Sequence, residues 1–177
     1  IGRAWSISFA RAGHEVALWD VDANAPGAAL IKIGETLPEL RRNGLLDENP
    51  DAVLPRVRAV ESLEAALDGA SYVQENSPER IEIKRELFAK LDALAAPDTV
   101  LASSTSAILP SAFSAELPGR ARVLVAHPIN PPHLIPAVEI VPAPWTSAGA
   151  IEQTTALMRA AGHAPIVLGK EIDGFVV

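Results

Sequence analysis

The stretch IGRAWSISFARAGHEVALWD, residues 1–20, contains the pattern that decides the fold. Residues 4–12 are apolar with helical spacing, and Gly13 follows them as a residue suited to end a helix. Residues 15–20, EVALWD, then predict a short buried strand that ends on an acid, Asp20. A helix followed at once by a buried strand is typical of chains in which helices cover a parallel sheet.

The same alternation of helix and strand patterns continues to the carboxyl end. Further strands are predicted at 56–60, 71–76, 99–104, 122–127, 138–141 and 164–170. Helices are predicted at about 26–43 with an interruption at Pro38, at 62–69, from Ser77 onward, and at 147–161. Ser77 is the expected cap of its helix, with Glu79 near the positive end of the helix dipole. These patterns predict an α/β fold, a Rossmann-like, doubly wound, mostly parallel sheet with helices on both faces.

Composition narrows the classes of function. The 177 residues are 49% hydrophobic and 21% charged, which indicates a soluble globular domain covering residues 1–177. A net charge of −7 argues against nucleic acid and anionic membranes as partners. With no cysteine there is no disulfide, thiolate metal site or cysteine nucleophile. Since no apolar run approaches the roughly 18 residues of a membrane span, and no signal peptide pattern is present, we expect a cytoplasmic protein.

Residues 1–20 also resemble the end of a dinucleotide-binding βαβ unit. There a glycine-rich turn brings backbone N–H groups to the pyrophosphate, and an acid about 20 residues on binds the ribose hydroxyls. Gly2 matches the last glycine of G-x-G-x-x-G, and Asp20 lies 18 residues after it. An ordinary helix–turn–strand is the alternative. Because an acid repels a 2′-phosphate, the dinucleotide interpretation favours NAD over NADP.

The first strand and two glycines of such a unit are not in the sequence. That strand is central in a doubly wound sheet, so its neighbours would lack ladder partners. We therefore expect the natural protein to extend before Ile1, with residues 1–177 a fragment.

The stretch VLVAHPINPPHLIPAVEIV, residues 123–141, places His127 at the end of one buried strand and Glu139 inside the next. Open α/β sheets bind ligands at the carboxyl ends of their strands. Histidine, with a pKa of about 6.5, suits the removal of an alcohol proton, and a paired carboxylate would fix its tautomer. Two alternatives stay open here: a core histidine with Glu139 facing solvent, and a zinc site of His127, His133 and Glu139 with a spacing unlike common zinc patterns.

Hydroxyl side chains end the preceding predicted strand in ASSTSAIL, residues 102–109. A neighbouring strand end can bring Ser104 or Ser106 beside His127, and helix capping is the alternative. A serine nucleophile is disfavoured because there is no G-x-S-x-G motif.

Taken together and in order, four segments resemble the L-3-hydroxyacyl-CoA dehydrogenase family, and within it the lambda-crystallin and L-gulonate 3-dehydrogenase branch. The segments are SSTSAIL (103–109), AHPINPP (126–132), VEIVPAPWTS (138–147) and GKEIDGFVV (169–177). The resemblance covers nearly all of the chain. It implies an NAD-binding domain, followed in the family by a helical C-terminal domain that completes the substrate site and makes a homodimer; IDGFVV, 172–177, resembles the junction.

The resemblance also implies roles for individual residues. The implied catalytic residues are His127 as base, Glu139 as its partner, Ser106 and Asn130. The implied contacts to NAD are Ile1, Gly2, Asp20, Glu79, Lys84 and Ser106, and no metal is implied. The implied substrate is a 3-hydroxy acid or 3-hydroxyacyl-CoA. Ser104 stands where many acyl-CoA members have asparagine, so the resemblance assigns it no contact. The segment HPINPPHLIPAVE lacks the aromatic residues common in acyl-CoA members, which favours the gulonate-like branch.

Two rival functions remain. A non-catalytic NAD-binding, crystallin-like protein would need none of Ser106, His127, Asn130 and Glu139. A 6-phosphogluconate type of dehydrogenase would use a lysine base, for which Lys84 and Lys170 are the candidates, neither at a convincing strand end.

Overall fold

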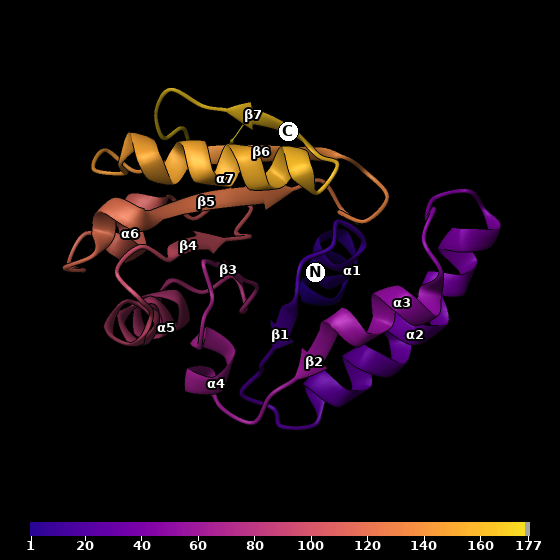
Figure 1. Ribbon diagram of the computed structural model, residues 1–177. Helices are drawn as coiled ribbons and strands as arrows, with labels where there is room; N and C mark the ends of the chain where they lie inside the picture. The colour runs from indigo at the N-terminus through magenta and orange to yellow at the C-terminus, as the bar shows by residue number, and fades with distance from the viewer. Residues whose placement is uncertain (176–177) are drawn as a thin grey trace.

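The computed structural model describes residues 1–175, and these form two separate sheets (Figure 1). In the smaller sheet, β1 (Val16–Leu18) pairs in parallel with β2 (Val57–Ala59). The larger sheet has the order β3-β4-β5-β6-β7 and is parallel except between β5 and β6. Its strands are β3 (Tyr72–Glu75), β4 (Val100–Ser103), β5 (Val123–Pro128), β6 (Ala137–Pro142) and β7 (Ala164–Val167). The predicted α/β fold with a mostly parallel sheet is confirmed.

Helices cover both faces of the larger sheet (Figure 1). The helices are α1 (Gly2–Arg11), α2 (Ala25–Arg42), α3 (Pro50–Val53), α4 (Leu63–Leu67), α5 (Ile81–Leu94), α6 (Pro110–Ser114) and α7 (Ala148–Ala160). Successive residues of a strand point to opposite faces. On β4, accordingly, Leu101 packs with α5 and α6, while Ala102 packs with α1 and α7. Burial on both faces explains why the strand patterns are continuously apolar.

The two sheets do not join. Among the described residues, β1 pairs only with β2 and β3 only with β4, so each has one edge without a strand partner. A cavity of about 380 Å³ lies between them, lined by residues that include Val16, Leu18, Tyr72 and Val73.

Two local predictions about helices were wrong. The helix predicted from Ser77 begins at Ile81, with Arg80 before it and no side-chain cap. Residues 77–80 stay outside the helix because their polar groups bond elsewhere: the Ser77 N–H donates to the Glu75 carboxylate, and Glu79 contacts a distant loop. The predicted interruption at Pro38 is also absent, and α2 continues through it while neighbouring leucines are fully or almost fully buried.

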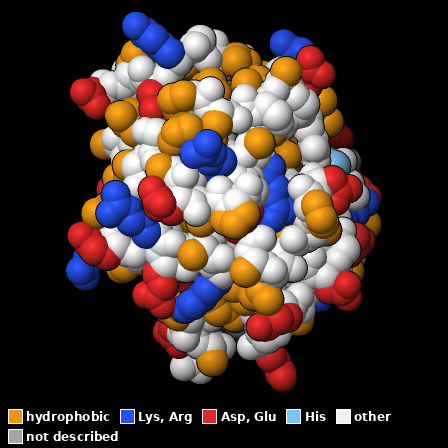
Figure 2. All heavy atoms as spheres, turned by 90° about the vertical axis from the view of Figure 1, so that its left-hand side faces the viewer, with side chains coloured by type: hydrophobic (Ala, Val, Ile, Leu, Met, Phe, Trp, Pro, Cys, Tyr) orange, Lys and Arg blue, Asp and Glu red, His pale blue; other side chains and the backbone are white. Residues whose placement is uncertain are grey.

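The surface is mixed in character. Viewed from the side of α5 and α6, Figure 2 shows acidic and basic side chains interspersed with apolar ones. No helix within residues 1–175 has both the length and the apolar character needed to cross a membrane.

Candidate active site

The ends of several strands meet at one edge of the larger sheet. Because β3, β4 and β5 are parallel, their carboxyl ends lie at the same edge. Glu75 ends β3, Ser103 ends β4, and His127 is the last residue but one of β5. The strand β6 runs antiparallel to β5, so its beginning lies at the same edge. This edge is where open α/β sheets bind ligands.

His127 and Glu139 stand directly opposite each other in the β5–β6 ladder. His127 Nδ1 lies 2.8 Å from Glu139 Oε2, within charge-assisted hydrogen-bond distance. Glu139 is 1% exposed and His127 is 9% exposed, so the carboxylate is enclosed while the imidazole keeps some access. A buried carboxylate that accepts from Nδ1–H leaves the other ring nitrogen, Nε2, with a free lone pair. The pair can therefore act as an oriented base.

Ser104 forms a fully satisfied buried junction behind this pair. Its hydroxyl accepts from Trp5 Nε1 at 3.0 Å and from Gln74 Nε2 at 2.7 Å, and donates to Asn76 Oδ1 at 2.8 Å. Gln74 Nε2 also donates to the carbonyl oxygen of Ala126, the residue before His127. A hydroxyl with one donated and two accepted hydrogen bonds has no capacity left. The Ser104 hydroxyl is therefore part of a hydrogen-bond network that links α1, β3 and β5, and it has no hydrogen bond left to make with a ligand.

Ser106 lies just beyond the end of β4 and is exposed. Its backbone N–H donates to Glu79 Oε1 at 3.1 Å, and the Ala107 N–H donates to the same oxygen at 3.2 Å. Thr105 Oγ1 donates to this oxygen as well. Burial by itself raises the pKa of the Glu79 carboxyl, but the hydrogen bond from Thr105, those from the amides and the charge of Lys84 outweigh it and lower the pKa.

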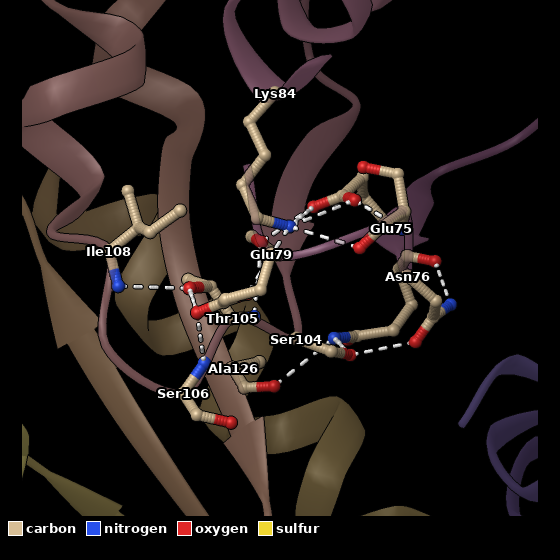
Figure 3. Close-up of polar contacts among 12 residues, drawn as sticks. Glu75, Asn76, Glu79, Lys84, Ser104, Thr105, Ser106, Ile108 and Ala126 are labelled. Carbon is tan, nitrogen blue, oxygen red and sulfur yellow. Dashed lines mark hydrogen bonds and ion pairs between the residues drawn. The ribbon is translucent and has the colours of Figure 1, made fainter. Parts of the chain in front are cut away.

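Lys84 is buried on the sheet side of α5 (Figure 3). Its Nζ donates to Glu75 Oε1 at 3.1 Å and to Oε2 at 3.0 Å, and lies 3.9 Å from Glu79 Oε2. The side chains of Glu75 and Lys84 are each 1% exposed. The structure therefore places Lys84 beside the site, with its ammonium on carboxylates of the protein.

The amino end provides groups that fit a dinucleotide. The helix α1 starts at Gly2 with no side-chain cap and no acid in its first turn, so its first N–H groups are available to an anion. Gly2 lies beside Asn76, which follows β3, so this helix end lies at the carboxyl edge of the sheet. Asp20 is exposed two residues after β1, the position at which dinucleotide-binding folds carry the acid that binds ribose.

The remaining candidates are placed as follows. Asn130 is exposed, in the segment between β5 and β6. Within residues 1–175, His127, His133 and Glu139 do not form a group that could hold a metal ion. Lys170 is exposed after β7 and Lys84 is buried on Glu75, so neither is presented as a base. The side chain of Phe175 packs near His127, with ring centroids 5.5 Å apart, while Val176 and Val177 of the predicted junction lie outside the described residues.

The sequence analysis did not identify Glu75 as part of this site. A signal for it exists. Lys84 is four residues before Phe88 and seven before Leu91, a spacing that places all three on the buried face of one helix. A buried lysine requires an acidic partner, and Glu75, at the end of the strand pattern that precedes this helix, is one of the acids that could supply it.

Comparison with known proteins gives consistent matches over the whole chain. The family model described as 3-hydroxyacyl-CoA dehydrogenase, NAD binding domain, matches residues 1–172. The lambda-crystallin homolog of Bos taurus is 40% identical over 100% of this chain and 56% of its own length. The L-carnitine dehydrogenase of Pseudomonas aeruginosa is 37% identical over 99% of this chain and 54% of its own length.

A solved structure matches closely as well. The crystal structure of 3-hydroxybutyryl-CoA dehydrogenase from Escherichia coli K12 has a TM-score of 0.89 and 32% sequence identity, and the match covers 94% of this chain and 35% of that one. The chain thus spans about half the length of the curated relatives it matches.

Proposed function

This chain belongs to the 3-hydroxyacyl-CoA dehydrogenase family as its NAD-binding domain, and from that premise we propose that the protein oxidises the hydroxyl group of a 3-hydroxy acid or 3-hydroxyacyl-CoA to a ketone. The observation that carries the proposal is the 2.8 Å contact between His127 Nδ1 and Glu139 Oε2 at the carboxyl edge of the sheet. A protein that only binds NAD does not need such a pair.

NAD, when bound, supplies the acceptor for the hydride that leaves the carbinol carbon. His127 Nε2 takes the hydroxyl proton in the same step, because Glu139 holds the proton of the ring on Nδ1. The carboxylate also stabilises the imidazolium that results. Ser106 and Asn130 are proposed to position the substrate oxygen and the nicotinamide ring. Ser106 lies exposed just beyond β4, and Asn130 lies exposed just beyond β5, the strand that carries the base.

Groups for binding the cofactor lie at the same edge. The backbone at Ile1 and Gly2 is proposed to face the pyrophosphate, and Asp20 to bind the adenosine ribose and disfavour NADP. Glu79 and Lys84 border the same region, next to Ser106. The C-terminal domain typical of the family is proposed to complete the substrate site and to form the homodimer.

Three finer functions are distinguished by substrate. The first is L-gulonate 3-dehydrogenase, favoured by the match to a lambda-crystallin homolog. The names of other matched proteins indicate oxidation of L-carnitine and of 3-hydroxybutyryl-CoA. We therefore propose assays of the natural full-length protein with these three compounds, each with NAD and with NADP.

Replacement of the base provides the decisive test. His127→Gln in the full-length protein is expected to lower turnover by about 10²- to 10⁴-fold, because general-base catalysis contributes a factor of this size. Affinity for NAD should change little. Turnover at the wild-type level in His127→Gln would remove this histidine from the mechanism, and absence of turnover in the wild type with every substrate would favour a crystallin-like structural role.

A further inference from the structure

A single carboxylate oxygen organises the turn that carries Ser106. Glu79 Oε1 accepts hydrogen bonds from the Thr105 hydroxyl and from the N–H groups of Ser106 and Ala107. Thr105 Oγ1 in turn accepts from the N–H of Ile108 at 3.0 Å. Consecutive N–H groups that converge on one anionic oxygen form a charge-assisted nest, a stronger arrangement than neutral hydrogen bonds. The conformation of the turn therefore depends on where Glu79 is held.

The backbone around Glu79 does not hold it by regular structure. Glu79 lies between β3 and α5, in residues 76–80, which form neither helix nor strand. What faces its second oxygen is the buried ammonium of Lys84, 3.9 Å from Oε2. Figure 3 shows this ammonium between the carboxylates of Glu75 and Glu79. Lys84 is thus the link between Glu79 and the interior.

Glu75 and Lys84, the buried members of the charged group that includes Glu79, are held by hydrogen bonds to the sheet. Glu75 ends β3 and binds Lys84 through both carboxylate oxygens. Ser103, the last residue of β4, donates to Glu75 Oε2 at 2.6 Å and accepts the Thr105 N–H at 3.2 Å. Two carboxylates therefore reach the same turn, Glu79 directly and Glu75 through Ser103. A buried charge pair of this kind is retained only with such additional hydrogen bonds.

We propose that Glu79, supported by Lys84 and Glu75, is a positioning residue that presents Ser106 to the reacting groups, and that Lys84 acts through Glu79 and not by its own contact with the cofactor. This inference rests on the proposed function for the role of Ser106. The arrangement of charges agrees with this proposal. Glu75 neutralises the charge of Lys84, and the Glu79 carboxylate, whose side chain is 45% exposed, accepts hydrogen bonds from three donors of the turn. In Figure 3 the Ser106 side chain extends away from Glu79, as presentation requires.

The first test measures the turn itself and needs no enzyme activity. Amide hydrogen exchange at Ser106 and Ala107, followed by NMR, is compared in wild type, Glu79→Ala and Glu79→Gln. Loss of hydrogen bonds to a charged acceptor should speed exchange at both amides by about 10- to 100-fold in Glu79→Ala. Glu79→Gln keeps an oxygen at the same reach and should restore part of the protection. Glu82→Ala, which removes an exposed acid of the first turn of α5, is the matched control and should leave both rates unchanged.

The second test separates positioning from direct contact. Glu79→Ala should lower kcat by up to about 10²-fold, the effect of misplacing a contact group by about 1 Å, and should weaken NAD binding by much less. In a double-mutant cycle of Glu79→Ala with Ser106→Ala, the kcat of the double variant should be no lower than that of Ser106→Ala alone, because Glu79 acts through Ser106. The proposal is overturned if both Glu79 variants keep wild-type exchange rates at Ser106 and Ala107. It is also overturned if the effects of Glu79→Ala and Ser106→Ala on kcat are additive, or if Glu79→Ala weakens NAD affinity as much as it lowers kcat. If the wild type has no turnover, the proposed function fails while the exchange rates still decide the role of Glu79.

Discussion

Replacing Glu139 by glutamine tests the catalytic pair with almost no change in shape. The carboxylate can only accept a hydrogen bond, so in the wild type it selects the tautomer of His127 with the proton on Nδ1. The amide of glutamine can also donate. If it donates to Nδ1, the ring proton moves to Nε2, the nitrogen that must remain free to act as the base. Glu139 is 1% exposed, so water is not there to replace the lost acceptor.

The size of the effect depends on which end of the amide faces Nδ1. If the oxygen faces it, a charge-assisted bond becomes a neutral one, a loss of about 1 to 1.5 kcal/mol, or roughly tenfold in rate. If the N–H faces it, the base is blocked and the loss approaches about 10⁴-fold. Because the less costly orientation already loses about tenfold, we expect a loss of tenfold or more.

Two measurements check this prediction. The tautomer of His127 is read by nitrogen NMR of the imidazole in wild type and Glu139→Gln, and kcat/KM is measured for hydride transfer to NAD. We expect the Nδ1–H form in the wild type, with a shift toward Nε2–H in the variant in proportion to the lost rate. An Nε2–H tautomer in the wild type, or full activity in the variant, would refute the reasoning.

Two further predictions concern stability. His163 is buried, and both of its ring nitrogens are without a hydrogen-bond partner among the described residues; burial and the nearby charge of Arg11 lower its pKa to about 4. In the unfolded chain the His163 imidazole is protonated with a pKa of about 6.5. The folded state therefore keeps its full stability above pH 6.5 and loses stability as the pH falls toward about 4. At 1.36 kcal/mol per pKa unit, the loss reaches roughly 3 kcal/mol. In His163→Leu, the free energy of unfolding measured with urea should fall less steeply between pH 6.5 and 4 than in wild type, and His14→Leu is the control. Equal dependence of the unfolding free energy on pH in wild type and His163→Leu would contradict the prediction. Lys84→Met leaves the Glu75 carboxylate buried without its cation, so it should cost about 3–5 kcal/mol in the same unfolding assay at pH 7. Adding Glu75→Gln should recover a large part of that loss, and no recovery would mean that the pair is not coupled.

Much of the fold followed from local pattern. The strands β4 and β5 are runs of apolar residues, and Gly13 and Gly162 follow the last residues of their helices with φ angles of +91° and +85°, a conformation that glycine adopts without strain. Local rules failed at Ser77 and Pro38. At Ser77 a plausible cap was overridden by Glu75 and by the turn at 105–107, both outside any local window.

For the candidate site, the amino-acid order by itself determined that a histidine ends a buried strand and that an acid lies inside the next apolar run. It did not determine that the two meet. That depends on β6 running antiparallel to β5 in the one alignment that sets His127 opposite Glu139, since a shift by a single residue turns the carboxylate to the other face of the sheet. The same holds for Glu75, Glu79 and Lys84, which are brought to the Ser106 turn by the parallel pairing of β3 with β4. Chemical type is a property of each residue, whereas proximity is set by how strands far apart in the chain align and pack.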